Sequence, residues 1–379
     1  MVGELRKFLC PEFIFGNDSR LLLGQYLMNF GVEKTFIVTD KKLREFSWFN
    51  DIITDLEEQS IEFDIFDDVT VNPKDFEVEL GAVKYEAYNA DIIVAIGGGS
   101  VIDCAKGIGI LVSNGGSIYD YEGVDQIDYP IPPLICIPTT SGSAADVSQF
   151  AIISNMVYDY KMALASKMLV PDMALVDPVV SLTCDFDLTV DTGLDAMVHA
   201  IEAYVSNASS FVTDIHALEA IKKIIIHLPR LTNDLDNLEE RSYVMQACLN
   251  AGLAFSNASL GLVHAMAHAL GGRLDLVHGE LNGVLVEQVV AFNYDASKER
   301  YDEISELIQQ NSDIKSDKIT EGLNEFIVSI RGNRTISEMS SKAVDLYDVA
   351  KYVLNDPCIV TNPKSASIED VVKIYEKIF

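Results

Sequence analysis

Residues of the kinds that bind transition metals are concentrated in two short segments of this 379-residue chain. The segment 192–204 reads TGLDAMVHAIEAY and predicts an amphipathic helix, in which a spacing of four places Asp195 and His199 on one face. The segment 260–280 adds three of the six histidines, including His264 and His278. One carboxylate and three imidazoles form a ligand set for a divalent metal that leaves one position open for substrate.

A purely structural interpretation of these residues stands beside the metal hypothesis. A histidine on a helix is often a satisfied core or surface residue, and an Asp–His pair four residues apart is often only a contact along the helix. Both segments are flanked by glycine and other small residues that allow helices to approach closely. Their joint occurrence therefore favours the metal site.

An independent signal lies upstream, where residues 90–110 read ADIIVAIGGGSVIDCAKGIGI. The short apolar run 92–96 predicts a buried strand, and the glycines 97–99 predict a sharp turn whose N–H groups can approach a ligand. Ser100 is expected to cap the following helix, whose N-terminus favours anions. Strand, glycine turn and helix together can hold a diphosphate. Neither the G-x-G-x-x-G fingerprint nor the Walker lysine is present, so a tight connection is the alternative.

Composition favours a soluble, cytoplasmic enzyme. The chain is long enough for two domains, and it shows neither a leader segment nor an apolar stretch that could span a bilayer. Six scattered cysteines without a C-x-x-C pair predict free thiols in a reducing compartment. The net charge of −30 argues against nucleic acid and anionic membranes as partners.

The order of predicted elements indicates the fold class. Predicted strands and helices alternate in the first half, which favours an N-terminal doubly wound, Rossmann-like parallel sheet. The predicted strands are 35–40, 61–66, 92–96 and 133–138, and the predicted helices are 21–31 and 74–90. Helical periodicity then dominates, over 190–206, 211–228, 238–255, 258–272, 296–310, 317–331 and 341–354.

Two domains follow from this pattern. We predict a dinucleotide-binding α/β domain over 1–183 and an all-helical, metal-binding catalytic domain over 184–379, with the active site in the cleft between them. The diphosphate turn falls in the first domain and the metal ligands in the second. A metal that polarises an oxygen beside a hydride carrier performs alcohol and carbonyl redox chemistry.

Segments along nearly the whole chain resemble the iron-containing (group III) alcohol dehydrogenases. The blocks around the metal ligands are the most specific, and the GGGS turn supports them. The matching segments are VTD (38–40), VNP (71–73), GGGSVIDCAKG (97–107), IPTTSGSAADVS (137–148), KMALAS (161–166), PDMALVDP (171–178), TGLDAMVHAIEAYVS (192–206), TDIHALEAI (213–221), AGLAFSNASLGLVHAMAHALGG (251–272), HGELN (278–282) and TNP (361–363).

The resemblance implies roles for individual residues. Asp195, His199, His264 and His278 match the family's metal ligands, and His268 resembles a catalytic histidine near the nicotinamide, a plausible end of a proton relay. Residues that match cofactor contacts are Asp40, Asn72, Gly98, Gly99, Ser100, Asp103, Thr139, Thr140, Ser143, Lys161 and His268.

Three of the matching positions bear on specificity. Asp40 corresponds to the family's ribose discriminator, where a carboxylate favours NAD over NADP, although a plain turn residue is the alternative. Phe150 and Phe255 fall where substrate-pocket side chains would lie, and either could equally be ordinary core.

The activity implied by the resemblance is hydride transfer between NAD(H) and a small primary alcohol or diol, with an aldehyde in the reverse direction. Fe²⁺ comes from the resemblance alone, because one aspartate and three histidines also suit Zn²⁺, Mn²⁺ or Co²⁺. The resemblance also implies a homodimer or a larger homo-oligomer. Two alternatives remain: a zinc-dependent, glycerol-type polyol dehydrogenase, and a catalytically weak regulator on the same scaffold.

Three departures from the family pattern motivate the regulator hypothesis. SGSAAD (141–146) stands where AGTGSE is usual, GVLVEQV (283–289) where LLPHV is usual, and FGND (15–18) where FGxG is common. In the first, Asp146 replaces a longer glutamate, and in the second, Glu287 and Gln288 replace proline and histidine. None of the three alters a predicted metal ligand.

Overall fold

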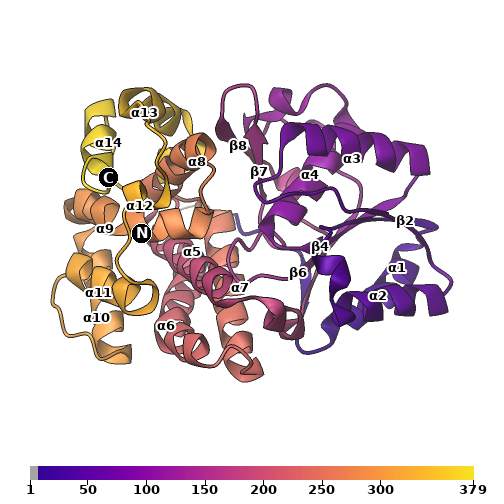
Figure 1. Cartoon of the computed structure of the whole chain (residues 1–379), viewed down its shortest axis with the longest axis horizontal. Helices are drawn as coiled ribbons and strands as arrows, with labels where there is room; N and C mark the ends of the chain where they lie inside the picture. The colour runs from indigo at the N-terminus through magenta and orange to yellow at the C-terminus, as the bar shows by residue number, and fades with distance from the viewer. Residues whose placement is uncertain (1–6) are drawn as a thin grey trace. The chain divides into compact units, whose positions relative to one another are not determined.

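A computed structural model describes residues 7–379 as two compact units (Figure 1). The α/β unit comprises Cys10–Thr140 and Ala144–Cys184. The helical unit comprises Asp185–Phe379 together with residues 7–9 and the short segment Ser141–Ser143. The sequence pattern alone did not indicate that this three-residue segment packs with the helices.

The α/β unit is built on a parallel sheet of six strands in the order β1-β9-β6-β4-β2-β3, and every neighbouring pair is parallel. The strands, in sheet order, are β1 (Glu12–Phe15), β9 (Met173–Val176), β6 (Leu134–Pro138), β4 (Ile92–Gly97), β2 (Lys34–Val38) and β3 (Glu62–Phe66). The predicted parallel sheet is confirmed.

Helices cover both faces of this sheet (Figure 1): α1 (Leu23–Phe30) and α2 (Ser47–Glu58) on one face, α3 (Asp75–Tyr88) and α4 (Gly99–Asn114) on the other. Alternate residues of the central strand β4 enter two separate cores: Ile92, Val94 and Ile96 lie in the core with α1 and α2, and Ile93 and Ala95 in the core with α3 and α4. A strand buried on both faces is therefore apolar throughout, as in other parallel sheets.

A second, small sheet was not predicted. It has the order β5-β8-β7, from β5 (Gly123–Val124), β8 (Tyr160–Ala165) and β7 (Phe150–Asn155), and β7 and β8 pair antiparallel. Its β7 alternates between partly and fully buried positions, so both faces are mostly covered and the polar–apolar contrast that identifies a strand from sequence is weak.

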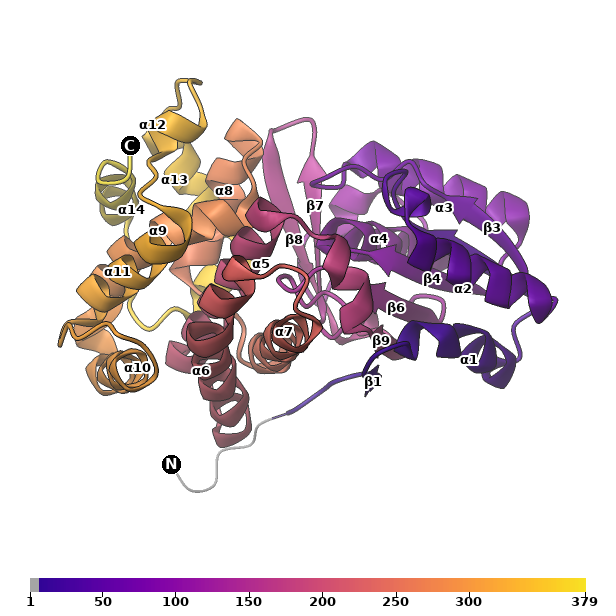
Figure 2. The same ribbon diagram turned by 60° about the horizontal axis from the view of Figure 1, so that its bottom comes forward.

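The helical unit contains α5 (Phe186–Val205), α6 (Phe211–Asn233), α7 (Leu238–Ala258), α8 (Leu262–Leu274), α9 (His278–Asn293), α10 (Lys298–Asn311), α11 (Ile319–Arg331), α12 (Ile336–Met339), α13 (Leu346–Asn355) and α14 (Ile368–Tyr375). The helix α5 contacts α6, α7 and α9, and α9 contacts α8 (Figure 2). Within residues 7–379, no helix is long and apolar enough to cross a membrane.

Several helix boundaries differ from the prediction by four or five residues, since α5 begins at Phe186 and α6 ends at Asn233, and two further differences have a clear local cause. The segment 258–272 was expected to be one helix, but α7 ends where Ser259 adopts a left-handed φ of 60°, and α8 begins only at Leu262. The helix expected over 341–354 begins at Leu346, after Asp345 caps it by accepting the N–H groups of Tyr347 and Asp348.

Candidate active site

Two of the predicted metal ligands lie on α5, a helix that is buried on nearly every side. Asp185 caps this helix by accepting the N–H of Leu188. Asp195 and His199 lie one turn apart, each 5 % exposed, and His199 Nδ1 is 3.9 Å from an Asp195 carboxylate oxygen. A hydrogen bond to the backbone of Gly142 also holds His199.

The helices α8 and α9 bring the other two predicted ligands to the same carboxylate. His264 Nε2 lies 3.7 Å and His278 Nε2 lies 3.9 Å from Asp195 Oδ1. Asp195, His199 and His264 offer ligand atoms that all lie within 4.8 Å of one another, and all three residues are buried. The side chain of His278 is 25 % exposed, so the cluster is open on its side, as a catalytic metal site requires.

The donor atoms of this cluster fit a cation. The side-chain nitrogen of Asn282 lies 2.7 Å from Asp195 Oδ1 and 3.2 Å from Nε2 of both His264 and His278. Because these three atoms surround one donor, an electron pair from each is directed towards the same point. Within the described residues, the buried Nδ1 of His199 has no hydrogen-bond partner. Convergent, incompletely satisfied acceptors in a buried site are what a transition metal would complete. Asn282 was not predicted from the sequence.

Electrostatics favour a charged carboxylate at the centre of the cluster. Burial opposes the ionised form of Asp195, but the charges of His199, His278 and His264 outweigh it and hold its pKa far below the usual range. Burial lowers the pKa of His199 to about 3. Burial also lowers the pKa of His264, but hydrogen bonds that its ring donates to the carboxylates of Asp195 and Glu202 overcome this and raise it to about 9. The site therefore holds an ionised Asp195 carboxylate among three imidazoles.

His268 lies beside the predicted ligands, one turn beyond His264 on α8. Its ring stacks on that of His278, with centroids 5.3 Å apart and an interplanar angle of 13°. Its Nδ1 is 2.7 Å from the buried carboxylate of Asp356, which precedes the short 3₁₀ helix Pro357–Thr361. Because an ionised carboxylate only accepts hydrogen bonds, Nδ1 carries the proton and Nε2 is left to accept one. Asp356 was not predicted.

One of the two candidate pocket phenylalanines lies against the cluster. The ring of Phe255, on α7, stacks on His199 with centroids 4.4 Å apart. Phe150 lies at the start of β7 in the α/β unit and is only partly buried. Phe255 is therefore placed to restrict the space beside a predicted ligand.

In the α/β unit, several predicted cofactor residues gather at the carboxyl ends of neighbouring strands. Asp40 follows β2, Gly98 follows β4, and Thr139 and Thr140 follow β6. A Cβ atom at Gly98 would lie 3.2 Å from the side chain of Thr140, a tighter contact than usual, so the absence of a side chain at Gly98 favours close approach. The carboxyl edge of a parallel sheet is where such folds bind ligands.

Asn72, Ser100 and Lys161 form a connected polar group near this edge. Lys161 Nζ donates to Asn72 Oδ1 at 2.7 Å, and the backbone N–H of Asn72 donates to Ser100 Oγ at 3.2 Å. The expectation that Ser100 caps α4 is wrong, because Gly98 is the N-cap and Ser100 lies inside the first turn. Gly99 is the first residue of that helix.

The remaining predicted cofactor residues are placed as follows. Asp40 Oδ1 accepts the N–H of Leu43, which is the behaviour of a turn residue and leaves its second oxygen for other partners. Asp103 accepts a backbone hydrogen bond from Ile152 and interacts with the charge of Lys161. Ser143 belongs to the short segment that packs with the helical unit.

A buried lysine that the sequence analysis passed over organises the segment after β6. Lys106, on α4, is fully buried, and its Nζ donates to the carbonyl oxygens of Ala145, Ser148 and Phe150 at 2.7–2.8 Å. Burial raises the pKa of the neighbouring Asp146 to about 6, although Lys106 lowers it. The departure SGSAAD is thus anchored to the helix that follows the glycine turn.

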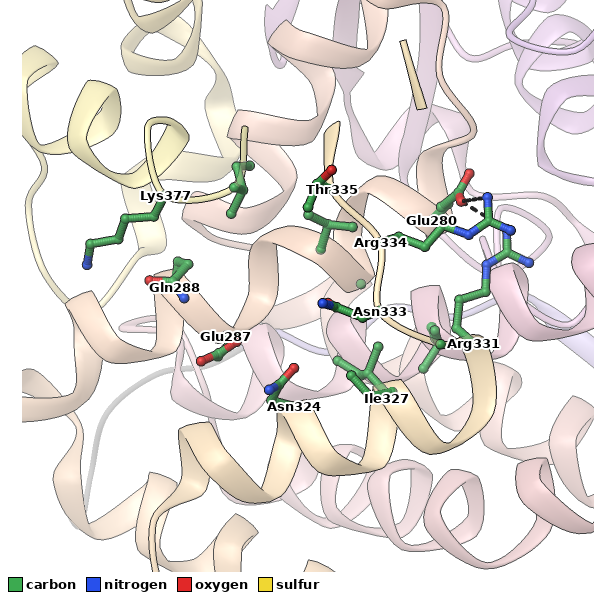
Figure 3. A pocket seen from close by; sticks show the side chains of 16 residues that line it. Glu280, Glu287, Gln288, Asn324, Ile327, Arg331, Asn333, Arg334, Thr335 and Lys377 are labelled. Atoms are coloured by element: carbon green, nitrogen blue, oxygen red, sulfur yellow. Dashed lines mark ion pairs between the residues drawn. The ribbon is translucent and has the colours of Figure 1, made fainter. Parts of the chain in front are cut away.

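The second departure, GVLVEQV, lies on α9, the helix that also carries His278. Glu287 and Gln288 line a pocket of about 240 Å³ in the helical unit (Figure 3). At the other end of this pocket, Arg331 and Arg334 form ion pairs with Glu280 (Figure 3). Both nitrogen–oxygen distances are 3.1 Å. None of the four predicted ligands is among the lining residues. This departure therefore alters none of the predicted metal ligands, and its Glu287 and Gln288 line the pocket instead.

The fold and the cluster together define a metal-dependent oxidoreductase, and comparison with known families specifies which. Residues 10–178 match the model of the iron-containing alcohol dehydrogenases, and residues 189–379 match the C-terminal model of the Fe-containing alcohol dehydrogenase family. The chain belongs to the iron-containing alcohol dehydrogenase family and is a metal-dependent alcohol dehydrogenase.

Characterised relatives match along almost their whole length. The NAD-dependent methanol dehydrogenase of Bacillus methanolicus is 34 % identical over 374 residues, covering 97 % of this chain and 98 % of the relative. The 1,3-propanediol dehydrogenase of Klebsiella pneumoniae is 34 % identical over 380 residues, covering 98 % of each. A solved 1,3-propanediol oxidoreductase has a TM-score of 0.92 at 34 % identity, covering 99 % of this chain and 100 % of its own. An alcohol dehydrogenase from Oenococcus oeni has a TM-score of 0.93 at 31 % identity, covering 99 % and 100 %.

Proposed function

We propose that this protein transfers hydride between NAD(H) and a small primary alcohol or diol, with the aldehyde as substrate in reverse, and that Fe²⁺ is held by Asp195, His199, His264 and His278. The observation that carries this proposal is the convergence of these four side chains on one buried point. When bound, the metal supplies a Lewis acid for the substrate oxygen, and NAD(H) accepts or donates the hydride.

The chain's own residues then perform three tasks. Asp195 and the histidines hold the metal, and the negative charge of Asp195 offsets part of its charge. His268, with its Nδ1–H directed to Asp356, leaves Nε2 to take up or release the substrate proton at the end of a relay. Phe255, stacked on His199, limits the size of the substrate. Small alcohols therefore fit best, which agrees with the methanol and 1,3-propanediol named for relatives.

The α/β unit supplies the support for the cofactor proposal. The start of α4 and the close approach at Gly98 suit a diphosphate, and the group of Asn72, Ser100 and Lys161 offers polar contacts beside it. Asp40 favours NAD over NADP, because a carboxylate accepts the 2′-hydroxyl and repels a 2′-phosphate. We further propose a cytoplasmic homodimer or larger homo-oligomer.

The test is anaerobic oxidation of NADH and of NADPH by the Fe²⁺-loaded protein, with aldehydes of one to six carbons. We expect turnover with NADH to exceed turnover with NADPH, and short aldehydes and hydroxyaldehydes to be preferred over longer ones. The Asp40→Ser variant should narrow the gap between the two cofactors. A preference for NADPH would overturn the cofactor assignment, and a preference for long chains would overturn the substrate class.

Two further measurements distinguish the proposed function from its two alternatives. A Zn²⁺-loaded sample that turns over glycerol faster than the Fe²⁺-loaded sample turns over short aldehydes would establish the polyol dehydrogenase instead. Measurable NADH binding without turnover under any metal would establish the regulator. The intact cluster of four side chains favours the active enzyme over the regulator. The match to the iron-containing family favours the iron enzyme over the zinc-dependent polyol dehydrogenase.

A further inference from the structure

Glu202 lies on α5 and belongs to none of the predicted sets. The spacing of Asp195, His199 and Glu202, four and then three residues, places all three on one face of the helix. Glu202 is 4 % exposed. A buried carboxylate is costly unless hydrogen bonds satisfy it, so the partners of Glu202 indicate its role.

The first partners of Glu202 are backbone amides at the start of α8. Its carboxylate accepts the N–H groups of Gly261 at 3.0 Å, Val263 at 2.6 Å and His264 at 3.4 Å. The N–H between them, of Leu262, donates to Asn362 Oδ1 at 3.1 Å. These are the amides that a helix leaves without partners inside itself, and a negative charge is favoured there. The side chains of Glu202 and Asn362 therefore accept the backbone N–H groups at the start of the helix that carries His264.

The second partner of Glu202 is the ring of His264 itself. Nδ1 lies 2.6 Å from Glu202 Oε2, and both groups are buried. An ionised carboxylate only accepts, so Nδ1 carries the proton of this hydrogen bond. Nε2, which faces Asp195 Oδ1 at 3.7 Å, is the nitrogen that is left to offer its electron pair. This tautomer and orientation are those that a metal-binding histidine needs.

We propose that Glu202 is the positioning residue of the metal centre, which holds the start of α8 and the tautomer of His264 with one carboxylate. The inference rests on the proposed metal site and goes beyond it, because Glu202 touches neither metal nor substrate. Asn362 provides the contrast, since it supports the same helix end without a hydrogen bond to the ring of His264.

The experiment compares Glu202→Ala, Glu202→Gln and Asn362→Ala in the full-length, metal-free protein. Co²⁺ affinity is measured by chelator competition, the visible spectrum of bound Co²⁺ reports ligand geometry, and thermal unfolding reports helix support. Glu202→Gln keeps an oxygen that can face His264 Nδ1, but it lacks the charge and presents a donor to one backbone N–H. We expect Co²⁺ affinity to fall about 100-fold in Glu202→Ala and about 10-fold in Glu202→Gln, with a weakened visible band.

Asn362→Ala should lower the unfolding temperature but leave Co²⁺ affinity and the spectrum close to those of the wild type. If that variant does not fold, Thr361→Val replaces it, because Thr361 Oγ1 donates to Leu260 O at the same junction. If Glu202→Ala does not fold, the proposal is tested by comparing the Co²⁺ affinity of Glu202→Gln with that of the control variant. The proposal would be overturned if the Glu202 variants bound Co²⁺ as tightly as the wild type. It would also be overturned if the control variant lost as much Co²⁺ affinity as the Glu202 variants. A wild type that binds no Co²⁺ would instead refute the metal site itself.

Discussion

His268 is the side chain that most directly separates proton transfer from metal binding. We expect His268→Ala to lower turnover about 100-fold and to change its pH profile, because the group that exchanges the substrate proton is lost. Bound metal should remain at the wild-type level. His216→Ala is the matched control, since His216 also lies on a helix but hydrogen-bonds Asn250 on α7. Metal analysis and pH–rate profiles check the prediction, and loss of metal in His268→Ala would assign the residue to the ligand set.

Asp146 makes the stability of the α/β unit depend on pH. Burial raises its pKa to about 6, above that of the same carboxyl in the unfolded chain, so the folded state binds its proton first as pH falls. The buried, ionised carboxylate of Asp146 therefore lowers the free energy of unfolding most above pH 6, and this effect shrinks towards pH 4. Relative to Asp146→Asn, the wild type should gain roughly 1 kcal/mol of unfolding free energy between pH 7 and pH 5. Urea unfolding at both pH values tests this, and parallel curves would exclude burial of Asp146 as the cause.

Among individual residues, local spacing indicated Asp195 and His199, but it gave no sign of two carboxylates whose histidine partners are distant in the sequence. Asp195 and His199 are four residues apart. Asp356 lies 88 residues after His268, and Glu202 lies 62 residues before His264, so no local pattern connects either pair. Glu202 nevertheless falls on the helical face of two predicted ligands, a signal that could have identified it.

At the scale of elements, the close packing of α9 on α5 determines where His278 lies. A Cβ atom at Gly279 would meet the backbone oxygen of Asp191 at 2.0 Å, and backbone cannot move aside as a flexible side chain can. Gly279→Ala should therefore push α9 away from α5. We expect a loss of about 3 kcal/mol or more in unfolding free energy, together with weaker metal binding.

Gly283→Ala is the control for this substitution, because it lies one turn later on the same helix. Its Cβ would meet Leu194 Cδ1 at 3.4 Å, an ordinary contact. Alanine favours helix over glycine by about 1 kcal/mol, so this variant should be neutral or slightly more stable. Chemical unfolding and metal titration of the two variants check the pair, and equal effects would show that the packing of α9 does not position His278.

Burial on several sides hid some elements but not all, since the fully buried strands β4 and β6 were predicted and the amphipathic helices α2 and α14 were not. The strands β2, β3, β4 and β6 and most helices of the helical unit lie close to their predicted ranges. The helix α9 was missed because it is apolar around much of its circumference, which weakens the helical period. The hairpin of β7 and β8 was missed for a similar reason.

At the scale of the whole molecule, the change from β–α alternation to continuous helices indicated the two kinds of structure. Sequence could not indicate that Ser141–Ser143 packs with the helices, because a three-residue segment has no period of its own. The family resemblance, carried by segments along the chain, is confirmed by models that match residues 10–178 and 189–379.

Metal bound between α5, α8 and α9 should also stabilise the folded chain. A ligand that binds only the folded state adds about 4 kcal/mol at a thousandfold excess over its Kd. We expect a chelator to lower the unfolding temperature of the metal-loaded protein by several degrees, which calorimetry can measure. Asp195→Asn should unfold at the same temperature with and without chelator. An equal chelator effect in that variant would place the stabilising metal elsewhere.

The most direct test of the proposed iron site is a titration of the metal-free protein with Fe²⁺ under anaerobic conditions, in which bound iron and NADH-dependent aldehyde reduction are followed together. We expect turnover to rise in proportion to bound iron, to reach its maximum at one iron per chain, and to be absent in Asp195→Asn. Full turnover by the metal-free protein, or by Asp195→Asn without bound iron, would contradict the proposed iron site.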